Sequence, residues 1–439
     1  MRQKLLVLLF GCAFSLPAAG AIYDLETAIT LGLKNNTQIL AASEARKASE
    51  GRSAEAISWA LPKLSLFGGY NYISSVPSIN ISIPTGPLTT IEKTVIAGAY
   101  DNWSFKAQLT QQIFDWGKIH GNISSSEAAA DASMRDLDAA AASVSFAVKQ
   151  AYFSVVFAKE ALAVSEESFN VSRQHLSDAE RKYKEGASSS FEVLRSRVQV
   201  SNLKPVVSKA KNNLEIAKLN LKIALGLPYS ESIDVSGKLA EQKITIPAYQ
   251  EKLRISLSTR PELLAARSRS KCARSALDSA SASDKPVLAG YASYNYQNPY
   301  FLQLSWTQSW NAGLNLNIPL FDGNFTAAKV KQAEAELNAV DIGVKRLEDS
   351  TASELKQLIL SLAEAKERIE AQKDAVAQAQ EYHKIAQVGF KSGTMTNLEV
   401  IDAELSLMNA KIGYLQALFD REVIEAGIER LAGPFGVRG

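Results

Sequence analysis

The segment WSFKAQLTQQIFD, residues 103–115, recurs as WNAGLNLNIPLFD, residues 310–322, and these two stretches decide the fold. From each tryptophan onward, apolar residues occupy most of the alternate positions, and mainly polar residues fill the positions between them. Such alternation predicts a β-strand with one apolar and one polar face. Each stretch ends in a Phe–Asp pair, after which a long helical pattern begins. The sequence therefore contains two copies of a strand-to-helix unit.

The spacing between the two copies is constant over long stretches. Upstream it is 224 positions, as from Pro62 to Pro286, and downstream it is 207, so the first copy has 224 − 207 = 17 extra residues between Tyr72 and Trp103. The pairs at 207 are Trp103 and Trp310, Phe114 and Phe321, Gly186 and Gly393, and Glu192 and Glu399. Self-similarity at a fixed spacing predicts a tandem duplication. We assign residues 22–228 to the first repeat and 229–439 to the second, and expect residues 73–101 to form a surface loop.

Within each repeat the pattern predicts a helix, two strands, a very long helix, a tight turn and another helix. Residues 117–185 and 324–392 contain no proline, and their apolar positions step by four and three. A sustained seven-residue period indicates coiled-coil-like packing. Each segment is therefore expected to form one rod of ~100 Å, at a rise of 1.5 Å per residue.

Both rods are predicted to end at a glycine, Gly186 and Gly393, because a left-handed residue commonly follows a helix C-terminus. Ser190 and Asn397 are then the expected N-caps of the following helices. Valine would occupy the third helical position of both, so no full capping box is expected.

The N-terminus predicts a secretory signal peptide over residues 1–21, with a basic start, an apolar stretch from Leu5 to Leu16 and Ala19-Gly20-Ala21 at the cleavage site. Removing it takes away Arg2 and Lys4, so 48 basic residues become 46, against 46 acidic ones. A neutral mature chain argues against a nucleic-acid partner.

The two cysteines leave no intramolecular disulfide after cleavage, because Cys12 lies within the signal and Cys272 remains alone. Cys12 is either a lipid-anchored residue or a small apolar residue of the signal, and we favour the second interpretation because the apolar run before it is short. No later segment has 18 consecutive apolar residues, so an exported chain would be periplasmic, secreted or part of an outer-membrane β-barrel.

The four predicted strands suit either a lipid-facing barrel with a polar lumen or a soluble sheet with one buried face. Four strands cannot close a barrel, and open edges cannot lie in lipid. A cyclic oligomer that pools strands from several chains would solve this problem.

No enzyme motif is found: HExxH, P-loop and GxSxG patterns are absent from the sequence. His120, His175 and His383 lie far apart, and His383 occupies an apolar seam position, where packing is the simpler role. We therefore expect no catalytic residues, no metal site and no cofactor.

These features together resemble the TolC-like outer membrane efflux protein family. The resemblance is carried by residues 112–117 and 319–323 at the strand-to-helix junctions and by residues 183–194 and 390–401 at the turns, and it covers 22–439. It implies a mainly α fold with a β-barrel part. Tandem-duplicated helical hairpins would form a periplasmic α-barrel, and each chain would give four strands to a shared trimeric barrel in the outer membrane.

The resemblance also implies partners for this homotrimer: outer-membrane lipid, a periplasmic adaptor protein and an inner-membrane pump. The duct would pass drugs, toxic compounds or proteins to the exterior. Residues 73–101 would face the outside of the cell. The adaptor would dock at the hairpin tips, although a purely structural hairpin explains the same residues: Gly186, Ala187, Ser188, Ser189, Gly393, Thr394, Met395 and Thr396.

A periplasmic gate is implied at Glu399 and Asp402, with Glu192 as an acidic partner, because family members place acidic groups at the tunnel constriction. Residues three apart share a helix face, and three copies would bring six carboxylates together and raise some of their pKa values. A solvated helix face is the alternative. Phe390 and Met395 replace a Tyr and an Arg that tie the hairpins together in the family pattern, so we expect more apolar closure. From a different class, a periplasmic or surface-attached coiled-coil protein remains the alternative function.

Overall fold

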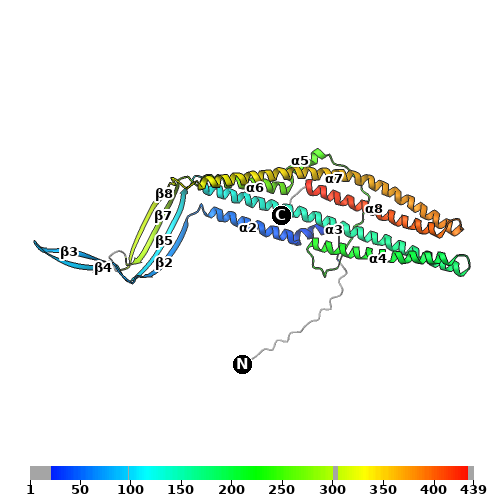
Figure 1. Ribbon diagram of the computed structural model, residues 1–439, viewed down its shortest axis with the longest axis horizontal. Helices are drawn as coiled ribbons and strands as arrows, with labels where there is room; N and C mark the ends of the chain where they lie inside the picture. Colours follow the sequence, from blue (N-terminus) through cyan, green and yellow to red (C-terminus); the bar gives the residue numbers. More distant parts are fainter. Residues whose placement is uncertain (1–20, 97, 300–304, 434–439) are drawn as a thin grey trace, which may run out of the picture. The chain divides into compact units, whose positions relative to one another are not determined.

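The computed structural model describes residues 21–96, 98–299 and 305–433 of the 439-residue chain. The predicted signal peptide and Cys12 lie outside the described residues, except that Ala21 begins the first strand. The elements in order (Figure 1) are β1 (Ala21–Tyr23), α1 (Leu25–Asn35), α2 (Thr37–Ser58), β2 (Lys63–Tyr72), β3 (Ser78–Gly86), β4 (Thr89–Ile96), β5 (Asp101–Phe114), α3 (Lys118–Lys184), α4 (Ser190–Leu225), β6 (Ile233–Val235), α5 (Tyr249–Thr259), α6 (Pro261–Ser281), β7 (Val287–Asn298), β8 (Thr307–Asn317), α7 (Phe325–Ser392) and α8 (Asn397–Ala432).

The duplication is visible in where the elements begin. The starts of α1 and α5 differ by 249 − 25 = 224, and those of α3 and α7 by 325 − 118 = 207. The second pair forms the two long rods, of 67 and 68 residues, so the prediction of two unbroken helices is confirmed. Both spacings equal those of the sequence repeats.

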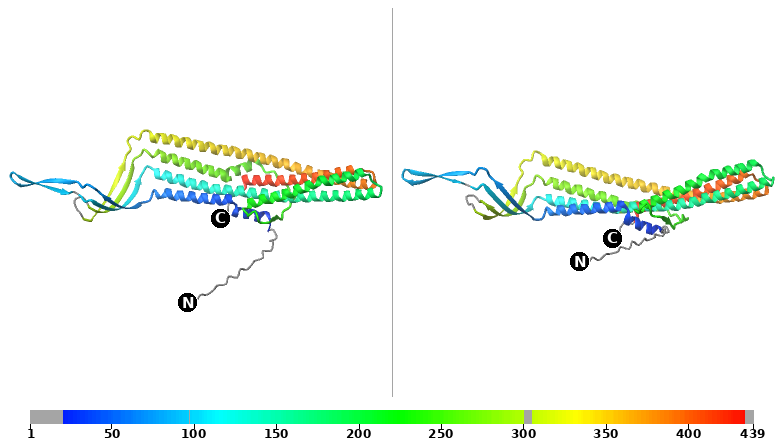
Figure 2. Two further views of the ribbon diagram at one scale, coloured as in Figure 1. Left: turned by 60° about the horizontal axis from the view of Figure 1, so that its bottom comes forward. Right: turned by 90° about the horizontal axis from the view of Figure 1, so that it is seen from below.

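The chain divides into two compact units. Among the described residues, one unit contains 21–44, 135–264 and 346–433, and the other contains 45–96, 98–134, 265–299 and 305–345. In the first unit the α3–α4 and α7–α8 hairpins lie side by side (Figure 2). Their interior is lined mainly by small and β-branched residues such as Val144, Val148 and Val155, all at most 2% exposed. Small side chains allow neighbouring helices to approach closely, as the seven-residue period predicts.

The first unit also contains a two-stranded parallel sheet that the sequence did not predict. In it, β1 pairs with β6 through Ala21 to Ile233 and Tyr23 to Val235. Each strand has three residues, too few for alternation to be recognised.

The second unit contains a four-stranded sheet in the order β2-β5-β7-β8, with every neighbouring pair antiparallel. The strand predicted to continue to Leu320 ends at Asn317, shortly before Pro319, which cannot donate a backbone hydrogen bond to a ladder. β2 and β8 are the two edges of this sheet.

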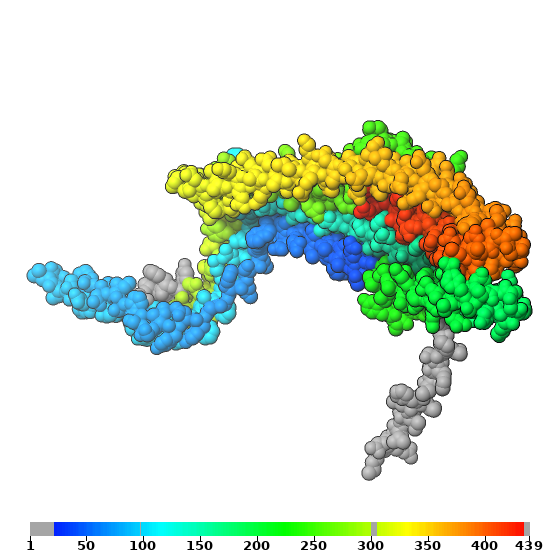
Figure 3. All heavy atoms as spheres, turned by 45° about the vertical axis from the view of Figure 1, so that its right-hand side comes forward, coloured from blue at the N-terminus to red at the C-terminus, as the bar shows by residue number. Residues whose placement is uncertain are grey.

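The segment expected to form a surface loop, residues 73–101, is exposed along most of its length and contains a β-hairpin. β3 pairs with β4 from Ser78–Ile96 to Gly86–Thr89 as a separate two-stranded sheet. Its light-blue atoms are exposed on the face of the molecule that Figure 3 shows. Its strand signal was present in the sequence, because Ile79, Ile81 and Ile83 alternate with polar residues and proline.

One described helix, α3, is long and apolar enough to cross a membrane by length and composition alone, and 39% of its most apolar window is buried. This is weak evidence for a span, because a core helix passes the same test. The valines of α3 in the helical core give its apolar character a packing explanation.

Candidate functional site

The four-stranded sheet has one continuous apolar face that no described residue of the second unit covers. The strand register joins Leu64 to Leu109, and Tyr70 to Trp103 with ring centroids 4.6 Å apart. Leu66 is 80% exposed, Leu314 69% and Trp310 77%. The opposite face has mainly polar residues, such as Gln108 and Asn311. A large exposed apolar face marks contact with a partner or with lipid.

The first hairpin tip ends α3 as predicted, with Gly186 in the left-handed region at φ 74°. The amide of Ala187 donates to the carbonyl of Lys182 over 2.8 Å, and that of Gly186 donates to Tyr183 over 3.0 Å. These bonds satisfy carbonyls that the last helical turn leaves open. Ser188 donates its hydroxyl to the carboxylate of Glu192, so both residues stabilise the turn.

The second tip repeats this arrangement, with Gly393 at φ 80°. The amide of Thr394 donates to the carbonyl of Gly389 over 2.9 Å. The side chain of Met395 covers Gly389, where an added Cβ would lie 2.7 Å from the Met395 Cγ. Gly389 therefore makes room for Met395 to fold back on α7.

The predicted helix caps were wrong by one residue at both tips. Ser189 caps α4, and Thr396 caps α8, where its hydroxyl accepts from the amide of Glu399. The carboxylate of Glu399 accepts from the Thr396 amide over 2.6 Å, so α8 does have a full capping box. These bonds to Thr396 hold the pKa of Glu399 below its usual range. Asp402, by contrast, is exposed.

Because Thr396 caps the helix, Asn397 is free to join the two hairpins. It is 2% exposed, and its amide nitrogen donates to the Glu192 carbonyl over 3.0 Å and to the Ser196 hydroxyl over 2.8 Å. Its amide oxygen lies 2.5 Å from Nε2 of His175. Asn397 thus bonds three groups of the first hairpin.

The His175 ring also contacts Phe390, with the ring centroids 4.9 Å apart. The ammonium of Lys182 lies 4.1 Å from the centre of the same Phe390 ring. A cation over an aromatic face is attracted by the ring electrons. Phe390 therefore contacts polar groups of the other hairpin, which the sequence did not predict.

A second buried link lies further along the hairpins, at Glu404. Glu404 is 4% exposed. Its carboxylate accepts a hydrogen bond from the Ser172 hydroxyl over 2.8 Å and another from the Ser168 hydroxyl over 3.1 Å. Burial raises the pKa of Glu404, and the two serine hydroxyls oppose that shift. His383 and Lys411 line the same small cavity, of about 30 Å³. The sequence offered only a weak signal for this link, a carboxylate next to apolar positions of α8.

Exposed apolar side chains lie close to both tips. On the first hairpin Phe191 is 65% exposed, and on the second Val388 is 62% exposed and Ile385 51%. Ile385 and Val388 line a groove of about 440 Å³ that reaches Thr394 and Met395. Among the described residues, no group of three or more His, Cys, Asp or Glu is arranged to hold a metal ion.

Comparison with known proteins gives a consistent picture. The sequence model of the outer membrane efflux protein family matches residues 28–227 and 253–434. The outer membrane protein TolC of Vibrio cholerae is 28% identical over 163 residues, which are 36% of this chain and 37% of that protein. The outer membrane efflux protein BepC of Brucella suis is 29% identical over 112 residues, 25% of this chain and 24% of that protein. The aligned stretches thus span well under half of these relatives.

Solved structures of outer-membrane channels share the fold over nearly the whole chain. The CmeC channel of Campylobacter jejuni has a TM-score of 0.80 at 16% identity, covering 94% of this chain and 87% of CmeC. CusC has a TM-score of 0.79 at 19% identity, covering 94% and 93%. At such low identity the likeness concerns the fold.

Proposed function

Because this chain belongs to the outer membrane efflux protein family, we propose that three copies of it form a duct that carries cargo across the outer membrane. The protein resides in that membrane, and its helices extend into the periplasm. Each chain would give β2, β5, β7 and β8 to one shared barrel, and its helical hairpins would continue as a tunnel. The two sequence repeats, 22–228 and 229–439, would each supply half of these parts.

The observation that carries this proposal is the exposed apolar face of the four-stranded sheet. In water, an uncovered face with Leu66 and Trp310 would lower solubility, whereas in a bilayer these side chains would contact the lipid acyl chains. The sheet edges β2 and β8 lack partners within the sheet, and unpaired backbone groups cannot remain in lipid. Pairing β2 of one chain with β8 of the next would close the barrel.

The same face argues against the second candidate, a periplasmic coiled-coil protein with a small sheet. Such a protein would bury the apolar face against its own helices. Purified protein in planar bilayers tests the two functions. A duct gives discrete conductance steps from a heat-modifiable trimer, and a soluble elongated monomer without conductance would contradict the proposal.

We also infer that the hairpin tips are where a periplasmic adaptor docks. The exposed Phe191, Ile385 and Val388 and the groove beside Met395 support this inference, because exposed apolar clusters mark protein contacts. An inner-membrane pump bound to that adaptor would then supply the energy for export.

The gate is proposed at Glu399 and Asp402, with Glu192 and Phe390 beside it. The capping bonds keep Glu399 ionised to lower pH than an ordinary glutamate, so a ring of three such charges would favour cations. We expect Asp402→Asn to reduce cation preference in single-channel recordings without affecting the cap. Unchanged preference in this variant and in Glu399→Gln would place both carboxylates outside the constriction.

A further inference from the structure

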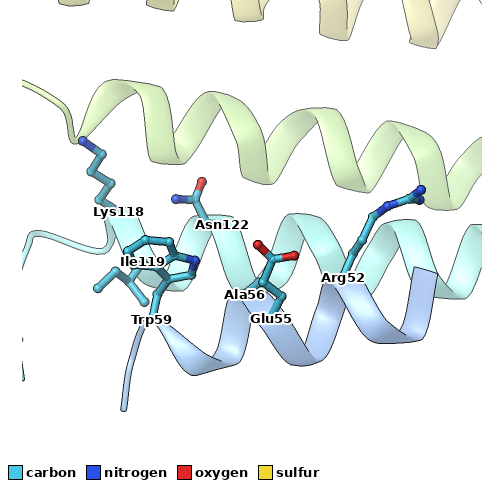
Figure 4. Close-up of a pocket in the computed structure, with 7 residues that line it drawn as sticks. All are labelled: Arg52, Glu55, Ala56, Trp59, Lys118, Ile119 and Asn122. Atoms are coloured by element: carbon cyan, nitrogen blue, oxygen red, sulfur yellow. The ribbon is translucent and has the colours of Figure 1, made fainter. Parts of the chain in front are cut away.

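A groove between α2 and α3 lies where the helices meet the four-stranded sheet. It has a volume of about 460 Å³ and is lined by Arg52, Glu55, Ala56, Trp59, Lys118, Ile119 and Asn122. Lys118 stands at one end and Arg52 at the other, with Trp59, Asn122 and Glu55 between them (Figure 4). The volume is in the range of ligand-binding clefts.

The groove is next to the start of the apolar sheet face. Trp59 is four residues before Lys63, where β2 begins, and Lys118 is four residues after Phe114, where β5 ends. At this junction between the helices and the sheet, Trp59 is 58% exposed, Phe114 51% and Trp116 55%. Exposed aromatic rings beside an apolar band are typical of the membrane–water interface. The groove therefore lies at the depth of lipid headgroups, if the sheet spans the membrane.

The charges of the groove have no ion-pair partners within it. Across the described ranges 21–96, 98–299 and 305–433, no ion pair involves Arg52, Glu55 or Lys118. Lys118 is also the first residue of α3, where the positive end of the helix dipole disfavours a cation. Lys63 lies with its ammonium 3.2 Å from the centre of the Trp59 ring. One ammonium group thus stands at one end of the groove, a second lies over the Trp59 ring, and a carboxylate lies between Trp59 and Arg52.

The second repeat provides an internal comparison. Adding 224 to Glu55, Trp59 and Lys63 gives Ser279, Ser283 and Val287, and adding 207 to Lys118 gives Phe325. At these four positions the second repeat therefore has no carboxylate, no indole and no ammonium group. The second repeat joins helix to strand without these residues, so their presence in the first repeat needs another explanation.

We propose that this groove binds the headgroup of an aminophospholipid from the periplasm-facing leaflet of the outer membrane. The phosphate would accept from Lys118 at the end nearest the sheet, with Lys63 close by. The primary amine would donate to Glu55, since the amide oxygen of Asn122 already accepts from Ser279 over 2.8 Å. The Trp59 ring would cover the glycerol and the first acyl carbons. A mixed-charge groove suits a zwitterionic headgroup, whereas an anion alone would leave Glu55 unpaired. The inference rests on the proposed membrane-spanning sheet.

Native mass spectrometry of the full-length protein in mild detergent tests this inference. The probes are phosphatidylethanolamine, phosphatidylcholine and inorganic phosphate, each added separately. We expect retention of phosphatidylethanolamine above phosphatidylcholine and no retention of inorganic phosphate. Lys118→Gln should weaken phosphatidylethanolamine retention about fivefold, the effect of one cation near a phosphate. Glu55→Gln should abolish the preference for the primary amine.

Lys329→Gln is the matched control, because Lys329 occupies the first turns of α7 in the second repeat and lies outside the groove lined by Lys118. It should retain phosphatidylethanolamine as the parent does. Equal losses in Lys118→Gln and Lys329→Gln would overturn the groove in favour of general interfacial charge, and equal retention of the two lipids would also overturn it. Conductance measured on the same samples separates the proposed duct from the proposed lipid site. A parent protein that conducts but shows no lipid preference would contradict only the lipid site.

Discussion

At the residue scale, the second hairpin tip shows how a shift of one position changes what three side chains do. Thr396 and Asn397 are both favoured N-caps, so the sequence alone did not separate them. Thr396 takes the cap, and Asn397 uses its donor and acceptor on the other hairpin. Glu399, expected only at a gate, completes the capping box. Such partners come from the other repeat, more than 200 residues away, so no local pattern reveals them.

We predict that Asn397→Ala loosens the contact between the hairpins. The change leaves the Ser196 hydroxyl and the Glu192 carbonyl without this partner, at about 1–3 kcal/mol for each buried group left unpaired. The thermal midpoint of trimer dissociation should fall, and the single-channel conductance should rise. Asn213→Ala, at an exposed position of α4, is the control and should change neither value. A parent-like midpoint in Asn397→Ala would show that the link does not stabilise the closed hairpins.

Glu404 should make the helical hairpins more stable in mild acid than at alkaline pH. Burial raises the pKa of Glu404 in the folded state. Its contribution to the free energy of unfolding is therefore fully present below the unfolded-state pKa and is lost as pH rises through the folded-state pKa. Glu404→Gln should flatten this dependence, which urea unfolding followed by circular dichroism at several pH values would measure. Glu166→Gln, at an exposed pair with Lys211, is the control. A steep dependence that survives Glu404→Gln would assign it to another group.

At the scale of elements, the long helices could be predicted because their period is repeated many times, and the glycines ended them as expected. The offset between the repeats predicts the place and the exposure of the β3–β4 segment but not its pairing, because the second repeat has no counterpart for comparison. The three-residue strands β1 and β6 pair across more than 200 residues. Their pairing depends on the packing of the helical unit and leaves no periodic signal.

We predict that Gly186→Val and Gly393→Val impair export while trimers persist in the outer membrane. Both glycines have positive φ, where a residue with a Cβ costs about 1–2 kcal/mol, and nothing lies within 4 Å to clash with the new side chain. The tip would therefore change its backbone path. Resistance to exported compounds measures the effect. Gly343→Val, also in open space but inside α7, is the control, and export unchanged in both tip variants would contradict adaptor docking there.

The β3–β4 hairpin should be reachable from outside the cell. Leu88, in the turn between the two strands, is 99% exposed, so an epitope tag inserted there should not disturb the pairing. An antibody should label intact cells that carry this tag. A tag beside Gly186 should be labelled only after the envelope is opened. The reverse pattern would invert the proposed orientation of the chain.

At the scale of the whole molecule, the duplication, the mainly helical fold and the family could all be inferred from the sequence. These inferences rest on the spacing between the repeats and on the periodicity of apolar residues, and both patterns extend over most of the chain. The gate could not be settled in this way, because which side chains face a common axis depends on neighbouring chains. The sheet presents the same difficulty: alternation predicts two unlike faces, but the structure of the sheet had to show that the apolar face remains uncovered.

The central claim is that three chains pool their strands into one barrel through the edges β2 and β8. Cysteine cross-linking in native membranes tests it most directly, with Cys272 first replaced by serine. One cysteine at Leu66 in β2 is combined in turn with one at Trp310, Ala312 or Leu314 in β8. We predict that at least one combination gives covalent species that stop at the trimer. Absence of cross-linked chains at every position, or a ladder that ends at another number, would contradict the shared barrel.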